Sequence, residues 1–245
     1  MSLADWPYPR WIAHRGAGKL APENTLAAFR LGAQRGYRMA ECDVKLSADG
    51  VPFLLHDATL ERTSNGRGMA GEQRWAALKQ LDAGAWHGAG FIGEPLPTLD
   101  AIADFCLDGG CLLNIEIKPT PGQERETGEV VARSAKQRWQ GRVPPLLTSF
   151  QPASLQAAQS VAADLPRGLL LDALWTGWLE TALTLDCVAV VCQHTLWDAS
   201  SVTQARSAGF RTLAYTVNDQ PEAERLIGLG IDGLITDRLD LFRPD

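Results

Sequence analysis

The chain has 245 residues, of which 45% are hydrophobic, and a formal net charge of −6 at pH 7. This acidic balance lacks the basic footprint of a general nucleic-acid binder, and no apolar run approaches the ~20 residues that a membrane-spanning helix needs. The N-terminal segment MSLADWPYPR has neither the basic start nor the apolar stretch of a secretory signal. These features predict a soluble cytoplasmic protein that binds no nucleic acid and has no stable membrane association.

Short apolar runs of strand type recur along the chain. Several are continuously apolar, which is typical of strands that helices cover. In chain order, the predicted strands are 10–14, 39–45, 111–118, 146–150, 168–171, 187–193, 211–217 and 233–237.

Helical patterns lie between these strands. The first is predicted to begin at Pro22 and to stop at Gly36, because proline is favoured at the first helical position and glycine just past the end. The predicted helices are 22–35, 98–107, 124–140, 152–163, 177–185, 199–208, 221–229 and, briefly, 239–242.

Alternation of strand and helix predicts βα units and a parallel sheet. Eight units in a chain of this length favour an α/β fold of the closed (βα)8 type, a TIM barrel, over an open doubly wound sheet. Residues 47–97 interrupt the alternation with a long stretch rich in glycine and proline, and such loops are usually functional. We predict one domain over 1–245, with a small insertion at about 47–97 after the second strand, over the C-terminal mouth of the barrel.

Three carboxylates are expected to meet at one end of the barrel. Glu41 and Asp43 are two residues apart on one strand and therefore share a face. Glu116 lies near the end of the next main strand. Such a set suits a hard divalent cation, Mg²⁺ or Ca²⁺, better than Zn²⁺. A salt-bridge network is an equally open alternative, with Lys45, Lys118 or Arg15 neutralising the carboxylates.

Two histidines are predicted near this cluster. His14 ends the first strand, and His56 follows the apolar residues 53–55. Two imidazoles can supply one base and one acid near neutral pH, and a bound metal can stabilise charge on a phosphoryl group. The combination predicts metal-assisted cleavage of a phosphodiester. Tyr215 ends the seventh strand, where core packing and contact with a ligand are equally open.

The ordered set His14-Arg15, Glu41-x-Asp43 and His56 resembles the pattern of the glycerophosphodiester phosphodiesterase family, in particular its cytosolic bacterial members associated with glycerol-phosphate uptake. The resemblance covers nearly the whole chain. It continues through the segments 21–25, 46–50, 56–57, 61–63, 97–99, 116–119, 215–218 and 236–237.

The resemblance implies a (βα)8 barrel with a small insertion after the second strand. It also implies one divalent cation, Mg²⁺ or Ca²⁺, held by Glu41, Asp43 and Glu116. The expected reaction is hydrolysis of a glycerophosphodiester to sn-glycerol 3-phosphate and an alcohol.

Roles for further residues follow from the same resemblance. His14 and His56 would be the acid–base pair, while Arg15 and Lys118 would contact the phosphate. Tyr215 falls where many relatives carry a tryptophan, which fits packing against the glycerol half of a small-molecule substrate.

Three alternatives compete with this function. A phospholipase-type enzyme acting on lysophospholipids would use apolar residues of the insertion, Trp75, Trp86, Phe91 and Ile92, as an entry surface. A non-catalytic phosphoester-binding protein could share the fold. A dinucleotide-dependent oxidoreductase is disfavoured, because no G-x-G-x-x-G follows the first strand. The sequence carries no signal for oligomeric state.

Overall fold

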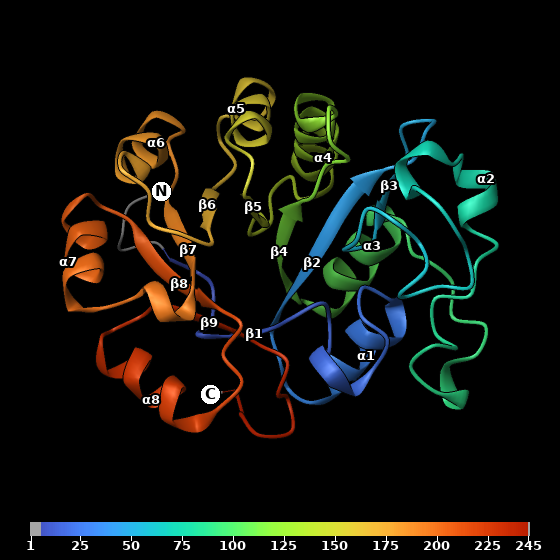
Figure 1. Cartoon of the computed structure of the whole chain (residues 1–245), viewed down its shortest axis with the longest axis horizontal. Helices are drawn as coiled ribbons and strands as arrows, with labels where there is room; N and C mark the ends of the chain where they lie inside the picture. Colours follow the sequence, from blue (N-terminus) through green and yellow to red (C-terminus); the bar gives the residue numbers. More distant parts are fainter. Residues whose placement is uncertain (1–5, 245) are drawn as a thin grey trace.

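The computed structural model describes residues 6–244 and contains a closed parallel barrel (Figure 1). The sheet of this described part has nine strands, and β1 pairs with both β9 and β2 to close it. Only β3 (Pro52–Leu54) is antiparallel, on the outer edge of β2. This confirms the predicted TIM barrel. Its parallel strands are β1 (Trp11–Ala13), β2 (Met39–Leu46), β4 (Leu112–Ile117), β5 (Leu146–Ser149), β6 (Arg167–Leu171), β7 (Ala189–Gln193), β8 (Arg211–Tyr215) and β9 (Gly233–Thr236).

Helices surround the barrel, each following a strand along the chain (Figure 1). The longer ones are α1 (Leu26–Gln34), α3 (Leu99–Gly109), α4 (Glu124–Arg138), α5 (Pro152–Val161), α6 (Trp178–Thr184), α7 (Ala199–Ser207) and α8 (Gln220–Gly228). Short helical turns occur at η2 (Gly18–Leu20), η3 (Ala70–Glu72), α2 (Trp75–Leu78), η4 (Ala89–Phe91) and η5 (His194–Leu196).

The predicted start of the first helix was wrong. α1 begins at Leu26, after Thr25, whose side chain caps the helix by accepting a hydrogen bond from the amide of Ala28. Asn24 has a φ of 58°, in the left-handed region, which no residue of a right-handed helix adopts. The segment from Pro22 to Thr25 is therefore a loop, and it reaches toward the C-terminal end of the barrel.

The predicted final helix at 239–242 was also wrong. These residues form a turn, in which the amides of Leu241 and Phe242 both bond to the carbonyl oxygen of Arg238. Forming the first turn of a helix is unfavourable, because it fixes several backbone dihedral angles for a single hydrogen bond. Such a short segment therefore does not extend into a helix.

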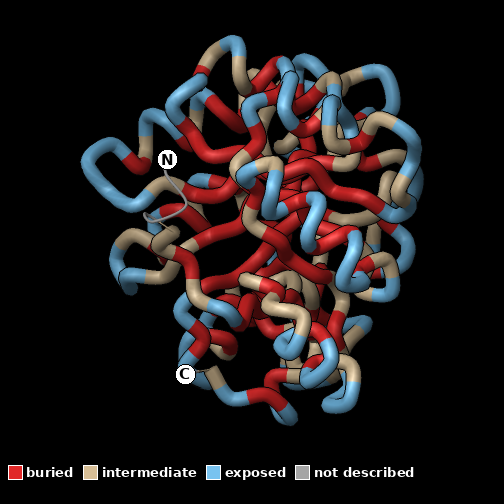
Figure 2. The backbone as a smooth tube through the Cα atoms, turned by 90° about the vertical axis from the view of Figure 1, so that its left-hand side faces the viewer, coloured by how far each residue is buried: buried red, intermediate tan, exposed pale blue. Residues whose placement is uncertain are grey.

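The interior of the barrel changes from apolar to polar along its strands. Met39, Ile12 and Leu146 belong to an apolar cluster inside the sheet. Two and four residues beyond Met39, on the same face of β2, stand Glu41 and Asp43. Figure 2 shows buried residues gathered in the interior of the molecule, with exposed residues in the segments around them. The polar end of the barrel is therefore the end at which the strands terminate.

The insertion has an apolar cluster of its own. Phe53, Leu60, Leu78 and Leu96 are among its fully or nearly fully buried members. β3 ties the insertion to β2, and the amide of Ala27 donates to Glu94 Oε1 at 2.8 Å, which ties it to α1. Figure 1 shows its helix α2 beside the barrel rather than across it.

That the chain forms a single domain over 1–245 stays a prediction, and residues 1–5 and 245 lie outside the described residues. The cytoplasmic location also stays a prediction, because it rests partly on that N-terminal sequence. Among residues 6–244, no helix has both the length and the apolar character required to cross a bilayer.

Candidate active site

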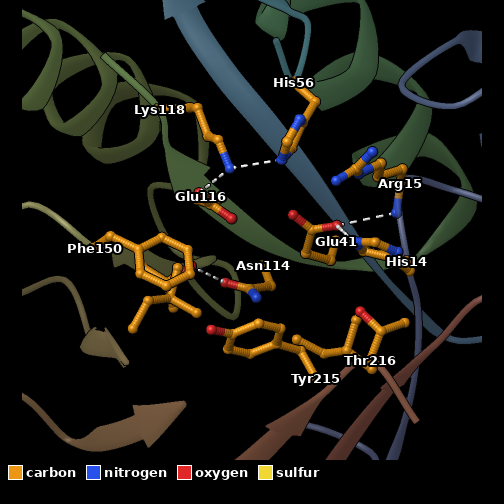
Figure 3. A pocket seen from close by; sticks show the side chains of 13 residues that line it. His14, Arg15, Glu41, His56, Asn114, Glu116, Lys118, Phe150, Tyr215 and Thr216 are labelled. Atoms are coloured by element: carbon orange, nitrogen blue, oxygen red, sulfur yellow. Dashed lines mark hydrogen bonds and ion pairs between the residues drawn. The ribbon is translucent and has the colours of Figure 1, made fainter. Parts of the chain in front are cut away.

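A pocket of about 210 Å³ opens at the C-terminal end of the barrel (Figure 3). Active sites of TIM-barrel enzymes occupy this end, where the loops after the strands converge. Five strands or their following loops contribute His14, Glu41, Glu116, Thr148 and Tyr215 to its wall, and His56 reaches it from the insertion.

Of the three predicted carboxylates, Glu41 and Glu116 line this pocket, and the buried Asp43 meets them beneath it. Asp43 on β2 pairs in register with Glu116 on β4, and Glu41 stands two residues before Asp43 on the same face. One oxygen from each of the three lies within 4.8 Å of the others. All three residues are buried, with exposed fractions of 3%, 1% and 8% for Glu41, Asp43 and Glu116. Cys42, between the first two, packs in the outer core, as period-two geometry requires.

Burial and mutual repulsion govern the ionisation of this cluster. Burial raises the pKa of Glu41, and raises that of Glu116 to about 7, with the charge of Asp43 adding to both effects. Burial also opposes ionisation of Asp43, but Arg15 and Lys118 outweigh it and hold the pKa of Asp43 below its usual range. Buried carboxylates this close together are costly without further positive charge.

Two of the three cations weighed in the salt-bridge alternative do contact the cluster. Lys118 Nζ lies 2.8 Å from Glu116 Oε1 and 3.5 Å from Asp43 Oδ1. Arg15 Nε lies 3.2 Å from Asp43 Oδ2. Three convergent carboxylate oxygens suit a hard divalent cation, and the ion-pair network lies beside them.

Lys45, the third cation of that alternative, contacts other groups. Its Nζ donates to the carbonyl oxygen of His56 at 3.2 Å and to that of Asp57 at 2.6 Å. Burial lowers the pKa of this fully buried lysine to about 8. Lys45 therefore holds the backbone on which His56 stands.

Each predicted histidine has one ring nitrogen held by a carboxylate. His14 Nδ1 lies 2.6 Å from Asp237 Oδ1, and His56 Nδ1 lies 2.7 Å from Asp57 Oδ1. Because an ionised carboxylate only accepts hydrogen bonds, Nδ1 carries the proton in both cases. Each Nε2 is therefore the ring nitrogen without a carboxylate partner at hydrogen-bond distance among the described residues, and both histidines line the pocket.

The two Nε2 atoms have different neighbours. His56 Nε2 is 2.8 Å from Lys118 Nζ, whereas His14 Nε2 is 3.8 Å from Glu41 Oε2 (Figure 3). Burial lowers the pKa of His56. The histidines thus flank the carboxylate cluster from β1 and from the insertion.

Arg15 occupies a strained turn directly after β1. Its φ is 49°, in the left-handed region that non-glycine residues rarely adopt. Its amide donates to Glu41 Oε2 at 3.0 Å, and its Nη1 donates to Glu23 Oε1 at 2.7 Å. The turn therefore aims both the backbone and the side chain of Arg15 at the acidic cluster.

Tyr215 combines the two alternatives left open for it. It lines the pocket, and its ring packs edge-on against Phe150 with 5.8 Å between centroids. Its hydroxyl donates to the carbonyl oxygen of Leu171 at 2.9 Å. Lys118 Nζ in turn lies 5.6 Å from the centre of the Phe150 ring. An aromatic wall thus stands beside the polar floor.

Asn24 and Asp237 are site residues to which sequence reasoning assigned no role. The Asn24 side chain donates to Asp43 Oδ2 at 2.8 Å and accepts from the Asp43 amide at 3.0 Å. Asp237 also accepts from Asn218 at 2.9 Å. Both lie in segments that carried the family resemblance, and this was the only signal that marked them.

Arg62, in the insertion, is a further residue without a role predicted from sequence, and it too lies in a segment that carries the family resemblance. Its guanidinium contacts Glu23 and Asp57, the carboxylates that hold Arg15 and His56. The hydrogen bonds that Arg62 donates lower the pKa of Asp57, and donating to Glu23 and Asp57 raises the pKa of Arg62.

Comparisons with known proteins agree with this geometry. Residues 14–241 match the model of the glycerophosphoryl diester phosphodiesterase family. A glycerophosphodiester phosphodiesterase of Caldanaerobacter subterraneus subsp. tengcongensis is 33% identical over 230 residues, which cover 92% of this chain and 93% of that protein.

Solved structures show the same likeness. A phosphodiesterase of Oleispira antarctica, in complex with the product sn-glycerol 3-phosphate, superposes with a TM-score of 0.90 and 37% identity over 94% of this chain and 93% of that one. A glycerophosphodiester phosphodiesterase of Agrobacterium tumefaciens has a TM-score of 0.81 and 29% identity over 96% of this chain and 99% of that one. The chain therefore belongs to the glycerophosphoryl diester phosphodiesterase family.

Proposed function

We propose that this enzyme hydrolyses glycerophosphodiesters to sn-glycerol 3-phosphate and an alcohol, with a divalent cation and two histidines as its chemical groups. The observation that carries the proposal is the pair of carboxylate-held histidines on either side of the buried acidic cluster. Family membership supports the substrate class, and the product bound to the Oleispira relative supports the glycerol 3-phosphate half.

Glu41, Asp43 and Glu116 would hold the cation. When bound, Mg²⁺ or Ca²⁺ would polarise a phosphoryl oxygen and offset the charge that develops on it. The three buried, closely spaced carboxylate oxygens support this assignment, because oxygen ligands of this kind suit a hard divalent cation.

Arg15 and Lys118 would bind the phosphate. Both side chains line the pocket beside the acidic cluster, and a guanidinium can hold two phosphate oxygens at once. Tyr215 and Phe150 would pack against the carbon atoms of the glycerol. This half of the substrate would be recognised closely, and the alcohol half would lie toward the pocket opening.

His14 and His56 would transfer the protons. One Nε2 takes the proton of the nucleophile, and the other protonated Nε2 gives a proton to the leaving alcohol as the P–O bond breaks. The nucleophile is either the neighbouring glycerol hydroxyl, which forms a cyclic phosphate that water then opens, or water itself. Asp237 and Asp57 keep each imidazole in the tautomer that leaves Nε2 free for this exchange.

Release of glycerol 3-phosphate from glycerophosphocholine tests the proposal. Chelator-treated protein should be inactive, and added Mg²⁺ or Ca²⁺ should restore release. Activity that is unchanged by chelation would overturn the metal assignment, and no release with either metal would overturn the reaction.

A phospholipase-type activity on lysophospholipids is the second candidate. Trp86 and Ile92 are 42% and 69% exposed on the insertion, as an apolar entry surface requires. Trp75, however, packs against Phe53 with 5.9 Å between ring centroids, and Phe91 packs against the core. With two of four apolar residues engaged internally, we favour the small soluble substrate. Faster turnover of lysophosphatidylcholine than of glycerophosphocholine would reverse this choice.

A further inference from the structure

Arg62 bridges two carboxylates at the rim of the pocket. Its Nε and Nη2 donate to Asp57 Oδ2 and Oδ1 at 2.6 and 2.9 Å. Its Nη1 and Nη2 donate to Glu23 Oε2 and Oε1 at 2.7 and 2.8 Å. The planar guanidinium therefore makes a two-point contact on each side, a geometry that a lysine cannot reproduce.

Each of these carboxylates also holds a residue of the proposed reaction. Asp57 Oδ1 lies 2.7 Å from His56 Nδ1, and Glu23 Oε1 lies 2.7 Å from Arg15 Nη1. Arg62 is thus linked to His56 through the carboxylate of Asp57 and to Arg15 through that of Glu23.

The bridge also joins two separate loops. Glu23 lies in the loop between β1 and α1, and Asp57 follows β3 in the insertion. Arg62 is 39 positions from Glu23 along the chain and five positions from Asp57. It therefore connects the loop that carries Arg15 to the loop that carries His56.

The contact differs from an ordinary surface ion pair. Isolated exposed pairs contribute little to stability, and Arg74 offers a comparison in the same insertion. Arg74 Nε is 3.6 Å from Asp49 Oδ2, with 78% of the arginine side chain exposed. The Arg62 side chain is 44% exposed, and its partners Glu23 and Asp57 are only 13% and 28% exposed.

We propose that Arg62 is a positioning residue that sets the orientation of His56 through Asp57 and of Arg15 through Glu23 at the same time. The inference rests on the proposed function, which gives His56 the proton transfer and Arg15 the phosphate. On this view the insertion takes part in catalysis by supplying the bridge between the two loops.

Removing the bridge should leave the fold intact. Lys45 still holds the backbone of His56 and Asp57 through their carbonyl oxygens, and Asn24 still ties the β1–α1 loop to Asp43. Only the side chains of His56 and Arg15 lose a contact, the one that Arg62 gives them through Asp57 and Glu23.

Kinetics with glycerophosphocholine and saturating metal test the proposal. In Arg62→Ala, kcat should fall about 10- to 100-fold, because a displacement near 1 Å suffices for such a loss, and KM should rise as Arg15 loses its alignment. Arg62→Lys should recover only part of kcat, since an ammonium group lacks the two-sided fork. The matched control Arg74→Ala should keep both constants, and the thermal midpoints of all variants should stay within about 2 °C of the parent.

A combined variant tests the route through Asp57. If Arg62 acts on His56 by way of Asp57, adding Arg62→Ala to Asp57→Asn should cost far less in kcat than Arg62→Ala costs alone. A parent-like kcat in Arg62→Ala, or a loss that only follows a lower thermal midpoint, would overturn the proposal.

Proton NMR gives a readout that needs no turnover. Arg62→Ala should shift or broaden the Nδ1 proton of His56 and leave that of His14 unchanged, because Asp237 holds His14 without Arg62. An unchanged His56 proton would contradict the positioning role. An inactive parent with the expected shift would instead count against the proposed reaction alone.

Discussion

At the scale of single residues, the imidazole orientation determines what the site can do. In His14 and His56 a carboxylate holds Nδ1, so that Nε2 faces the pocket. The other two histidines of the chain do not line this pocket, although His87 lines a neighbouring cavity with His14 and Arg15. His87 contacts the carbonyl oxygen of Lys19, and His194 pairs with Glu222.

Removing either pocket histidine should therefore be severe. His14→Ala and His56→Ala are each expected to lower kcat by at least about 100-fold, the usual contribution of a proton-transfer group. Glycerol 3-phosphate release under metal saturation measures the loss. His194→Ala is the matched control and should keep parent activity. Near-parent kcat in both pocket variants would remove the two-histidine assignment.

Residue chemistry was predictable where it depended on local spacing. The two-residue separation of Glu41 and Asp43 placed them on one face of a strand without any knowledge of the fold. The partners of the cations were not predictable in this way. Lys45 was weighed as a neutralising cation for the acidic cluster, yet it turns to the carbonyl oxygens of His56 and Asp57.

At the scale of elements, the loop between β1 and α1 shapes the site through its helix cap. Thr25 Oγ1 accepts from the Ala28 amide at 3.2 Å and donates to the Pro22 carbonyl oxygen at 2.7 Å. The cap ends the loop that carries Glu23 and Asn24. A helix beginning at Pro22 would have removed both from the pocket rim.

Thr25→Ala should lower the free energy of unfolding by about 1 kcal/mol, the usual cost of a lost N-cap. Activity should fall as well, because the loop that bears Glu23 loses its anchor. Thr25→Ser keeps the hydroxyl and should retain most of both. Urea unfolding followed by circular dichroism measures the stability, and equal losses in the alanine and serine variants would count against a capping role.

An ion-pair cluster links α8 to the segment after β7. Glu222 Oε1 accepts from Arg225 Nη2 and from His194 Nδ1, both at 2.6 Å. The hydrogen bonds from Arg225 lower the pKa of Glu222 from 4.5 to about 2. The cluster therefore contributes its full stability above pH 4.5 and loses it as pH falls toward 2.

Glu222→Gln should accordingly lower the unfolding free energy near neutral pH by about 1 kcal/mol, a modest value because the pair is partly exposed. The difference from the parent should shrink as the pH is lowered from 4.5 toward 2. Urea unfolding across this window provides the measurement. A difference that stays constant across this window would count against the ion-pair role of Glu222.

At the scale of the whole molecule, the apolar packing inside the barrel and the candidate active site lie at different levels along the barrel axis. The apolar cluster with Met39 and Leu146 fills one part of the interior, and the acidic cluster occupies the C-terminal end. Buried carboxylates at that end carry a cost that the apolar part of the fold must offset.

Metal binding should therefore stabilise the entire molecule. For chelator-treated protein, Mg²⁺ or Ca²⁺ at 100 times its Kd should add about 2.7 kcal/mol to the unfolding free energy, which raises the thermal midpoint by roughly 5–10 °C in a chain of this length. Differential scanning calorimetry measures the shift. Asp43→Asn should abolish it, whereas Asp104→Asn, on the exposed face of α3, should not. A shift of equal size in Asp43→Asn would place the metal elsewhere.

Local sequence patterns were enough to predict the alternation of strands and helices, the inward faces of the strands and the residue types at the C-terminal end. These depend on periods of about two and 3.6 residues and on local composition. The pairs of side chains that meet in the site depend instead on how the whole chain folds. Closure of the barrel brings His14 to Asp237 across 223 positions, and the insertion brings Arg62 to Glu23 across 39. No local pattern encodes such pairs, because their distance depends on the packing of every element between them.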